Sequence, residues 1–266
     1  MIRAMSYAIC LDTNYGRFIM NRHDRHQPLA ILRTGAPHIE PEIRALLTIA
    51  DILPDGALVV DAGANIGLIS VPLAQRLQGK AGSVLAFEPQ RLIYYMLAGN
   101  TALAGLENLT CLQMGLSDCA SAANVPNLNP HVDQDFGMVT LTEDDGSGDL
   151  VQTIALDDLG LERLDLLKID VEHMELPVLV GATETIKRHR PFIWIEVWPD
   201  NYAPIYDWMT QNGYSMRIVD ELNFCAIPQE RDYEFPLDLP EFDGVSNFLA
   251  AAAGLPVPAS REDAAQ

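Results

Sequence analysis

Residues 59–67, VVDAGANIG, form the pattern with the clearest chemical meaning in this chain. An apolar run ends in Asp61, and Gly63, Asn65 and Gly67 follow before the next apolar stretch. Glycine lets the backbone approach a ligand closely, and the first N–H groups of a helix have no partner within the helix. A strand–turn–helix corner of this kind is where open α/β sheets bind nucleotide-like cofactors. The pattern therefore predicts a cofactor site.

Three predicted strands close with an acid, at Asp61, Glu88 and Asp170. In a doubly wound sheet the carboxyl ends of the strands line one crevice, so these three side chains are expected to share it. Glu196 ends a further predicted strand on the same rim. Glu88 lies about twenty residues beyond the glycine turn, where an acid can bind both ribose hydroxyls of a nucleoside.

The charge at the turn favours one cofactor over another. The turn lacks the G-x-G-x-x-G spacing of dinucleotide sites, and the carboxylate of Asp61 would repel a pyrophosphate. An acid at this position suits a ligand with positive charge, such as a sulfonium. The residues therefore favour S-adenosyl-L-methionine over NAD, and a nicotinamide oxidoreductase remains the less favoured alternative.

The elements that must position these residues alternate along the chain. Hydrophobic patterning predicts strands at 57–61, 83–87, 109–114, 164–169 and 192–197, with helices at 66–78, 92–104, 176–189 and 205–212. Such alternation indicates a mainly parallel sheet with helices on both faces. Two final strands at 215–219 and 223–227 are joined directly, so they are expected to be antiparallel.

Three regions are predicted around this pattern. Residues 1–40 would form an N-terminal hairpin and cap, 41–230 the main domain, and 231–266 an extension that frays at its end. The polar stretch 120–149 is too long for an ordinary connection and is expected to be an insertion with its own hairpin or a functional loop. Residues 1–40, 120–149 and those after 228 would shape the pocket for a second substrate.

Composition excludes several classes of protein. Net charge is −20, with 37 acidic and 17 basic residues, which argues against nucleic acid or an anionic membrane as a partner. No stretch reaches the ~20 apolar residues of a membrane span, and no secretory signal is recognisable. The four cysteines have no disulfide or zinc spacing. These features predict a cytoplasmic protein.

Taken together, the motifs are similar to those of the FkbM-type methyltransferase family over roughly residues 40–200. They appear in the family's order as VVDAGANIG at 59–67, AFEP at 86–89, GLSD at 115–118, TIALDDL at 153–159, LLKIDVEHME at 166–175 and RPFIWIEV at 190–197. The resemblance implies an α/β fold of the class I methyltransferase type, a doubly wound sheet of seven strands with the last strand antiparallel. It implies transfer of a methyl group from S-adenosyl-L-methionine to a hydroxyl of a small metabolite or sugar.

The resemblance also assigns roles to residues. Asp61, Gly63, Asn65 and Gly67 would hold the methionine portion of the cofactor, and Glu88 its ribose. Ser117 and Asp118 match the segment that borders the adenine. The candidates for catalysis at the transferred methyl are Asp170, His173 and Glu196, and Glu172 would face the methyl as well.

His173 departs from the family pattern I-D-V-E-G-x-E, because it stands where that pattern has glycine. A positive φ at this position would strain a histidine. His173 is therefore either a local change in the loop or a near-neutral titrating group beside the crevice.

Structural interpretations remain for several of these residues. Asp61 could cap a helix, Glu88 could be an ordinary acid of a helix N-terminus, and Lys168 is expected to form a structural pair. We expect no metal site from Asp170, Glu172, His173 and Glu175, and His23 and His26 are expected to lie at the surface. A non-catalytic protein that binds S-adenosyl-L-methionine is the second alternative for function.

Overall fold

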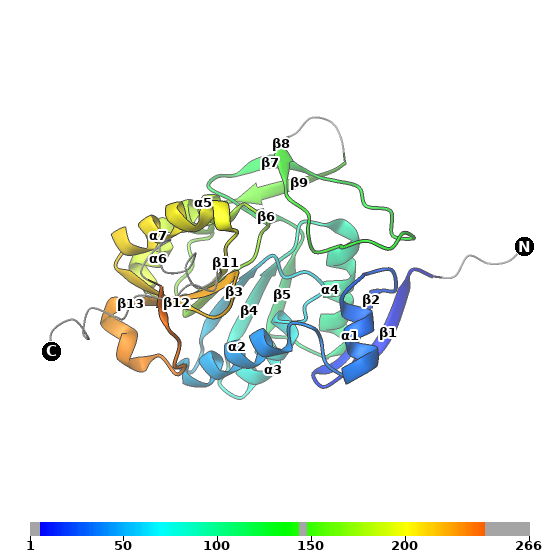
Figure 1. Ribbon diagram of the computed structural model, residues 1–266, viewed down its shortest axis with the longest axis horizontal. Helices are drawn as coiled ribbons and strands as arrows, with labels where there is room; N and C mark the ends of the chain where they lie inside the picture. Colours follow the sequence, from blue (N-terminus) through cyan, green and yellow to red (C-terminus); the bar gives the residue numbers. More distant parts are fainter. Residues whose placement is uncertain (1–5, 144–147, 243–266) are drawn as a thin grey trace, which may run out of the picture.

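The computed structural model describes residues 6–143 and 148–242. The predicted frayed end after residue 255 lies outside this part of the chain. The centre is a sheet of eight strands in the order β14-β12-β13-β11-β10-β3-β4-β5 (Figure 1). Its members are β3 (Leu58–Ala62), β4 (Ser83–Phe87), β5 (Leu109–Leu112), β10 (Leu166–Ile169), β11 (Phe192–Glu196), β12 (Tyr214–Ile218), β13 (Asn223–Pro228) and β14 (Glu241–Phe242).

The strand directions confirm the predicted fold class. Strands β5, β4, β3, β10 and β11 are parallel neighbours, whereas β13 is antiparallel to both β11 and β12. The seven strands from β5 to β12 in this order thus follow the class I methyltransferase arrangement. The short strand β14 adds an eighth at the edge and is antiparallel to β12.

Helices cover both faces of this sheet, because the parallel strands are apolar on both sides. On one face lie α2 (Glu40–Ile52), α3 (Ser70–Gln78) and α4 (Arg91–Leu103), and on the other α5 (Glu175–Gly181), α6 (Thr183–His189) and α7 (Tyr202–Gln211) (Figure 1). Adjacent residues of β3 divide between the two cores: Val59 packs in the cluster that includes Leu73, and Val60 in the cluster that includes Leu179. Both valines are fully buried.

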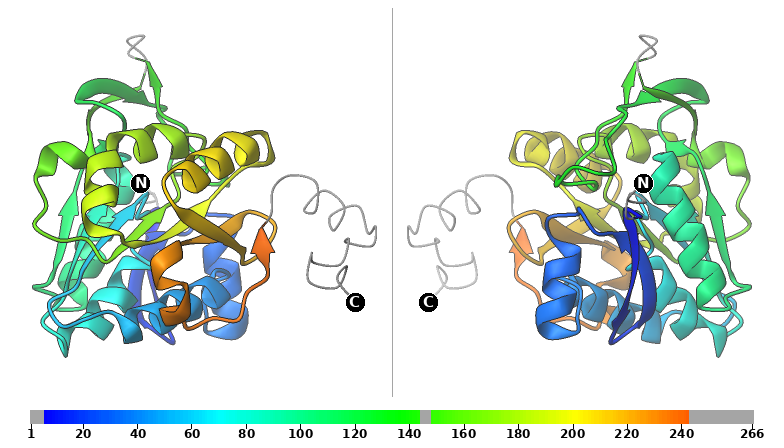
Figure 2. Two further views of the ribbon diagram at one scale, coloured as in Figure 1. Left: turned by 90° about the vertical axis from the view of Figure 1, so that its left-hand side faces the viewer. Right: turned by 90° about the vertical axis from the view of Figure 1, so that its right-hand side faces the viewer.

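The N-terminal segment forms a hairpin, β1 (Ala8–Thr13) and β2 (Gly16–Asn21), followed by α1 (Gln27–Thr34). Asn100 of α4 attaches the hairpin to the main body. Its side-chain amide accepts from the backbone N–H of Ile19 at 2.6 Å and donates to the carbonyl of Ile19 at 3.0 Å. The hairpin therefore lies beside α4 at the β5 edge of the molecule (Figure 2).

The insertion predicted at 120–149 contributes to a separate four-stranded sheet. This sheet has the order β6-β9-β7-β8 and consists of β6 (Gly115–Leu116), β9 (Asp149–Ile154), β7 (Ser121–Val125) and β8 (Thr142–Glu143). It stands above the carboxyl edge of the central sheet (Figures 1 and 2). Short 3-10 helices at Leu156–Leu159, Pro199–Asn201 and Gln229–Glu234 complete the connections.

Two of the differences from the predicted helix bounds have a clear structural reason. The helix expected at 66–78 begins only at Ser70, because residues 64–67 form a turn closed by the bond from Gly67 N–H to the Ala64 carbonyl. The helix expected at 176–189 is divided into α5 and α6 after Gly181. A Cβ added to Gly181 would lie 2.0 Å from the Ser117 carbonyl oxygen, so close backbone packing accompanies this break.

Candidate functional site

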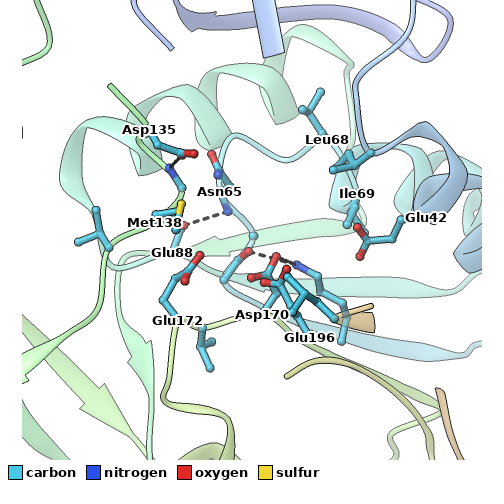
Figure 3. A pocket seen from close by; sticks show the side chains of 18 of the residues that line it. Glu42, Asn65, Leu68, Ile69, Glu88, Asp135, Met138, Asp170, Glu172 and Glu196 are labelled. Atoms are coloured by element: carbon cyan, nitrogen blue, oxygen red, sulfur yellow. Dashed lines mark hydrogen bonds and ion pairs between the residues drawn. The ribbon is translucent and has the colours of Figure 1, made fainter. Parts of the chain in front are cut away.

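A cavity of about 810 Å³ opens at the carboxyl ends of β3, β4, β10 and β11 (Figure 3). We call Gly63, Glu88, Asp170 and Glu196 the cavity floor, because each stands at or just after one of these strand ends. A volume of this size is typical of sites for small molecules and cofactors. The structure thus brings together acids that lie more than a hundred residues apart in the sequence.

The glycine turn fits closely against the neighbouring strand end. Gly63 has a φ of +79°, and a Cβ at this position would lie 1.7 Å from the carbonyl oxygen of Asp170. Its N–H and that of Ala64 donate to the Phe87 carbonyl at the end of β4. Asn65 has a φ of +51°, a conformation that asparagine tolerates better than most residues. Only glycine fits at position 63, which leaves the backbone open toward the cavity.

Glu88 is held by the backbone on both sides. Its carboxylate accepts hydrogen bonds from the N–H groups of Asn65 at 2.9 Å and Gln90 at 2.8 Å. Burial raises the pKa of Glu88 to about 7, although the two backbone donors oppose this shift. The carboxylate is therefore fixed in orientation and lines the cavity next to the glycine turn.

Asp61 is fully buried, does not line the cavity and belongs to a buried ionic network. It accepts a hydrogen bond from the hydroxyl of Ser70, and the ammonium of Lys168 lies 3.5 Å from its other oxygen. Lys168 also lies 3.0 Å from Asp170, and the two residues Lys168 and Asp61 are direct partners in the β10–β3 register. Burial alone would lower the pKa of Lys168, but Asp170, Asp61 and Glu42 raise it, so the ammonium stays charged.

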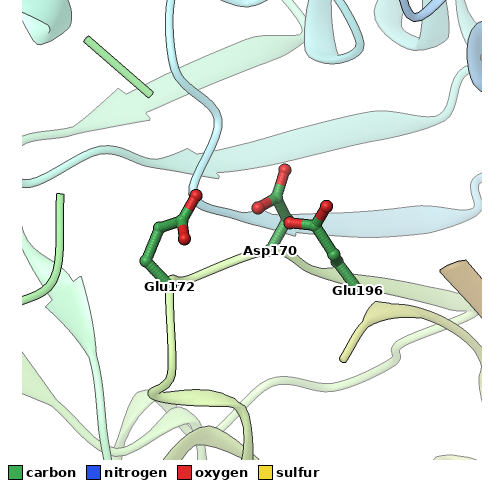
Figure 4. A group of neighbouring side chains, drawn as sticks. All are labelled: Asp170, Glu172 and Glu196. Carbon is green, nitrogen blue, oxygen red and sulfur yellow. The ribbon is translucent and has the colours of Figure 1, made fainter. Parts of the chain in front are cut away.

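Asp170, Glu172 and Glu196 form a compact carboxyl cluster (Figure 4). Each offers one oxygen, and these oxygens lie within 4.8 Å of one another. Burial, then the charge of Asp170 and the hydrogen bond to it, raise the pKa of Glu196 to about 9. Burial opposes ionisation of Asp170 too, but Lys168 and the hydrogen bond from Glu196 hold its pKa below the ordinary value.

The protonation of the cluster follows from these shifts. Near neutral pH, Asp170 is the carboxylate and Glu196 the protonated partner that donates to it. Burial and the charge of Asp170 raise the pKa of Glu172 to about 7. The hydrogen bond from Glu196 to Asp170 and the Lys168 ammonium reduce the repulsion within this cluster.

The structure places the predicted site residues in two groups. Gly63, Asn65, Glu88, Asp170, Glu172 and Glu196 line the cavity, whereas Asp61, Gly67, Ser117, Asp118 and His173 do not. Residues just before the predicted Ser117-Asp118 pair, Met114 to Leu116, line it instead. The backbone N–H of Ser117 donates to the Ile154 carbonyl.

His173 occupies an exposed position with a φ of +70°, and the preceding Glu172 has a φ of +47°. Its ring stacks on Trp198 with a centroid distance of 5.5 Å and an interplanar angle of 24°. Its N–H donates to the carboxylate of Glu175 at 2.8 Å. The loop thus adopts the left-handed conformation that the family glycine suggested, with a histidine in its place.

The other side of the cavity draws on residues 1–40 and 120–149, two of the regions expected to shape a substrate pocket, although no sequence motif singled out the side chains. We call His26, Glu42, Asp135 and Met138 the cavity wall; they come from the N-terminal region and from the segment after Pro130. His26 and Asp135 form an ion pair of 3.0 Å across these two segments. No periodicity or motif joins residues so far apart, so only the folded structure reveals this wall.

The chain is similar in sequence to known methyltransferases. The model of the methyltransferase FkbM domain matches residues 61–216, more than half of the 266 residues. Methyltransferase sdnD from Sordaria araneosa is 34% identical over 164 residues, which cover 50% of this chain and 62% of that protein. The AMB antimetabolite synthetase AmbE from Pseudomonas aeruginosa is 30% identical over 172 residues, which cover 50% of this chain but 8% of the synthetase.

The chain therefore spans less than two thirds of the length of these relatives. Among solved structures, methyltransferase FkbM from Methylobacillus flagellatus KT superposes with a TM-score of 0.46 and 22% identity, covering 65% of this chain and 44% of that one. Within the described residues, no helix is long and apolar enough to cross a membrane.

Proposed function

The chain belongs to the FkbM family of S-adenosylmethionine-dependent methyltransferases, and we propose that it methylates a hydroxyl group of a small metabolite or sugar. The observation that carries this proposal is the cavity floor, where a glycine turn, a ribose-type acid and a carboxyl pair share one edge of the sheet. This arrangement also supports S-adenosyl-L-methionine, rather than NAD, as the bound cofactor.

The residues present fit that cofactor. Gly63 leaves the backbone open where a Cβ would collide, and Glu88 presents a fixed carboxylate for the ribose hydroxyls. The region between them and β11 contains the Asp170 carboxylate, which is paired with Lys168, and Glu172, whose pKa of about 7 leaves it partly ionised near neutral pH. A positively charged sulfonium is stabilised by such surroundings, whereas a pyrophosphate would be repelled.

The reaction needs positioning and one proton acceptor. When bound, S-adenosyl-L-methionine supplies a methyl group whose C–S bonding electrons leave with sulfur as the acceptor oxygen forms the new C–O bond. Asp170 is the ionised member of the carboxyl pair, so it is suited to receive the hydroxyl proton, and Glu196 orients Asp170 by its hydrogen bond. Holding the acceptor in line within the cavity accelerates the reaction, and a base adds roughly 10²–10⁴-fold.

His173 remains the competing candidate for the base, and His173→Gly tests it. The ring is exposed and outside the cavity lining, so we expect methyl transfer by the variant to keep its rate and pH profile. Because glycine relieves the positive φ, unfolding free energy should change by no more than about 1 kcal/mol. A large fall in rate with a changed pH profile would instead make His173 the base.

The acceptor is tested by product analysis. The chain is incubated with S-adenosyl-L-methionine labelled in its methyl group and with panels of hydroxylated sugars and polyols, amines, and carboxylic acids. Label on an oxygen of a hydroxylated product supports the proposal. Label found only on nitrogen or on a carboxylate would contradict the hydroxyl assignment while leaving methyl transfer intact.

A further inference from the structure

Glu42 is an acid of the cavity wall that no sequence motif identifies. It belongs to the first turn of α2 and precedes the segment matched by the family model, which begins at residue 61. Its side chain points into the cavity beside Ile69 (Figure 3). Among the described residues, its carboxylate has no hydrogen bond or ion pair in the structure.

The position of Glu42 along the cavity is visible in Figure 3, where Glu88 and Glu42 lie on opposite sides of Asp170. The order along the cavity is therefore Glu88, then Asp170, then Glu42. A ligand whose ribose lies at Glu88 and whose sulfur lies near Asp170 would extend its remaining end toward Glu42.

Backbone donors lie beside Glu42. The N–H groups of Leu68 and Ile69 immediately precede α3 and donate no hydrogen bond within the described part of the chain, as is usual at a helix start. Both residues line the cavity. An acid next to free N–H donors is complementary to an amino acid, because the acid binds the ammonium and the N–H groups bind the carboxylate.

Asp61 cannot supply the acidic part of this arrangement. The residue is fully buried and does not line the cavity; Ser70 donates to one of its oxygens, and the other lies 3.5 Å from the Lys168 ammonium. We propose that Glu42, instead of Asp61, binds the α-ammonium of the methionine end of S-adenosyl-L-methionine, with the N–H groups of Leu68 and Ile69 facing its α-carboxylate. This assignment rests on the proposed function.

The electrostatics around Glu42 agree with a cationic partner for its carboxylate. Burial and the neighbouring acids Asp170, Asp61 and Asp220 raise the pKa of Glu42 to about 7, although Lys168 opposes the shift. An ammonium at this position would compensate for the burial of the carboxylate and for the repulsion from its acidic neighbours.

Calorimetric titration with two ligands tests the assignment. S-adenosylhomocysteine carries the amino-acid end, and 5′-methylthioadenosine has the same adenosine and sulfur without it. We expect Glu42→Gln to weaken S-adenosylhomocysteine about 10- to 100-fold, which is the range for a charged hydrogen bond, and to leave 5′-methylthioadenosine unchanged. Glu40→Gln, on the same helix turn and outside the cavity lining, is the matched control and should bind both ligands as the wild type does.

The outcomes separate this inference from the proposed function. Equal binding of S-adenosylhomocysteine by the wild type and Glu42→Gln would overturn the role of Glu42, as would equal weakening of both ligands. If the wild-type chain binds neither ligand, the proposed function fails first and the assignment fails with it. Should Glu42→Gln unfold, Glu42→Asp keeps the charge on a shorter side chain and should show the same selective weakening to a smaller degree.

Discussion

The cavity floor and the cavity wall are built by different means. Floor residues are fixed by the backbone: Gly63 fits against the Asp170 carbonyl, and Glu88 accepts two backbone N–H groups. The wall depends on side chains from separate segments, as in the ion pair between His26 and Asp135, whose side chains are 55% and 27% exposed. A floor fixed by the backbone suits a cofactor held in one orientation, whereas each side chain of the wall can be altered without moving the backbone of the floor.

The largest effect on stability is expected at Gly63, where the neighbouring backbone leaves no room for a side chain. Gly63→Ala would place a methyl group 1.7 Å from the Asp170 carbonyl in a backbone conformation of positive φ. We expect the free energy of unfolding to fall by about 5 kcal/mol or more, measured by urea denaturation.

Gly79→Ala is the matched control, because its φ is −64° and a Cβ there would meet nothing within 4 Å. It should be neutral or stabilise the protein by a few tenths of a kcal/mol. Equal stability of the two alanine variants would show that the glycine turn is not tightly packed.

The next largest effect on stability is expected from the buried ionic network of Asp61, Lys168 and Asp170. Lys168→Met leaves Asp61 and Asp170 without their cation, and the lysine side chain is only 3% exposed. Breaking a buried pair from one side costs about 3 to 5 kcal/mol, so thermal and urea unfolding should both shift strongly. Lys187→Met removes an exposed pair with Glu184 and should have no measurable effect. A Lys168→Met protein as stable as the wild type would refute the network.

The carboxyl pair predicts an unusual dependence of stability on pH. Glu196 has a folded-state pKa of about 9, so between pH 4.5 and 9 the folded protein holds a proton that the unfolded chain has lost. Unfolding free energy should therefore fall as pH rises through this window, by up to about 1.4 kcal/mol per pH unit for one such group.

Glu196→Gln resembles the protonated acid and cannot ionise. Thermal unfolding of the ligand-free variant should change less between pH 7 and 9 than that of the wild type. Glu42, Glu88 and Glu172, whose pKa values are raised to about 7, still contribute below that range in both proteins. Parallel curves above pH 7 would show that Glu196 is ionised in the folded state.

The smallest effect is expected at the wall. His26→Gln removes a largely exposed ion pair, so unfolding free energy should change by less than about 1 kcal/mol. His23→Gln removes the comparable 2.7 Å pair with Asp133, which joins the same two segments outside the cavity lining. If either histidine variant lost as much stability as Lys168→Met, the wall would be as rigid as the floor, contrary to our account.

The sequence was sufficient to predict the floor. Alternating strands and helices place successive strand ends at one edge, which predicts that Asp61, Glu88, Asp170 and Glu196 share a crevice. Glu88, Asp170 and Glu196 line the cavity, whereas Asp61 is fully buried outside its lining. The glycine turn was recognisable because positive φ restricts the residues that can form it. Local pattern and chain order are enough when the backbone itself does the positioning.

Sequence could not predict how side chains pair across the sheet. Asp61 is buried beside Lys168, its partner in the strand register, which lies more than a hundred residues later in the sequence. Glu42 lines the cavity because α2 packs against α3. Asp135 lines it because the insertion at 120–149 extends over the same cavity. Such contacts depend on packing between distant segments, which leaves no periodic signal.

The central claim is that the cavity floor binds S-adenosyl-L-methionine, and calorimetric titration of the wild-type chain with S-adenosylhomocysteine tests it most directly. NAD serves as the control ligand, and Glu88→Ala as the control variant. We predict saturable binding of one S-adenosylhomocysteine per chain, no binding of NAD, and an affinity at least about 100-fold lower in Glu88→Ala. Binding of NAD instead, or of S-adenosylhomocysteine with equal affinity by both proteins, would contradict the account.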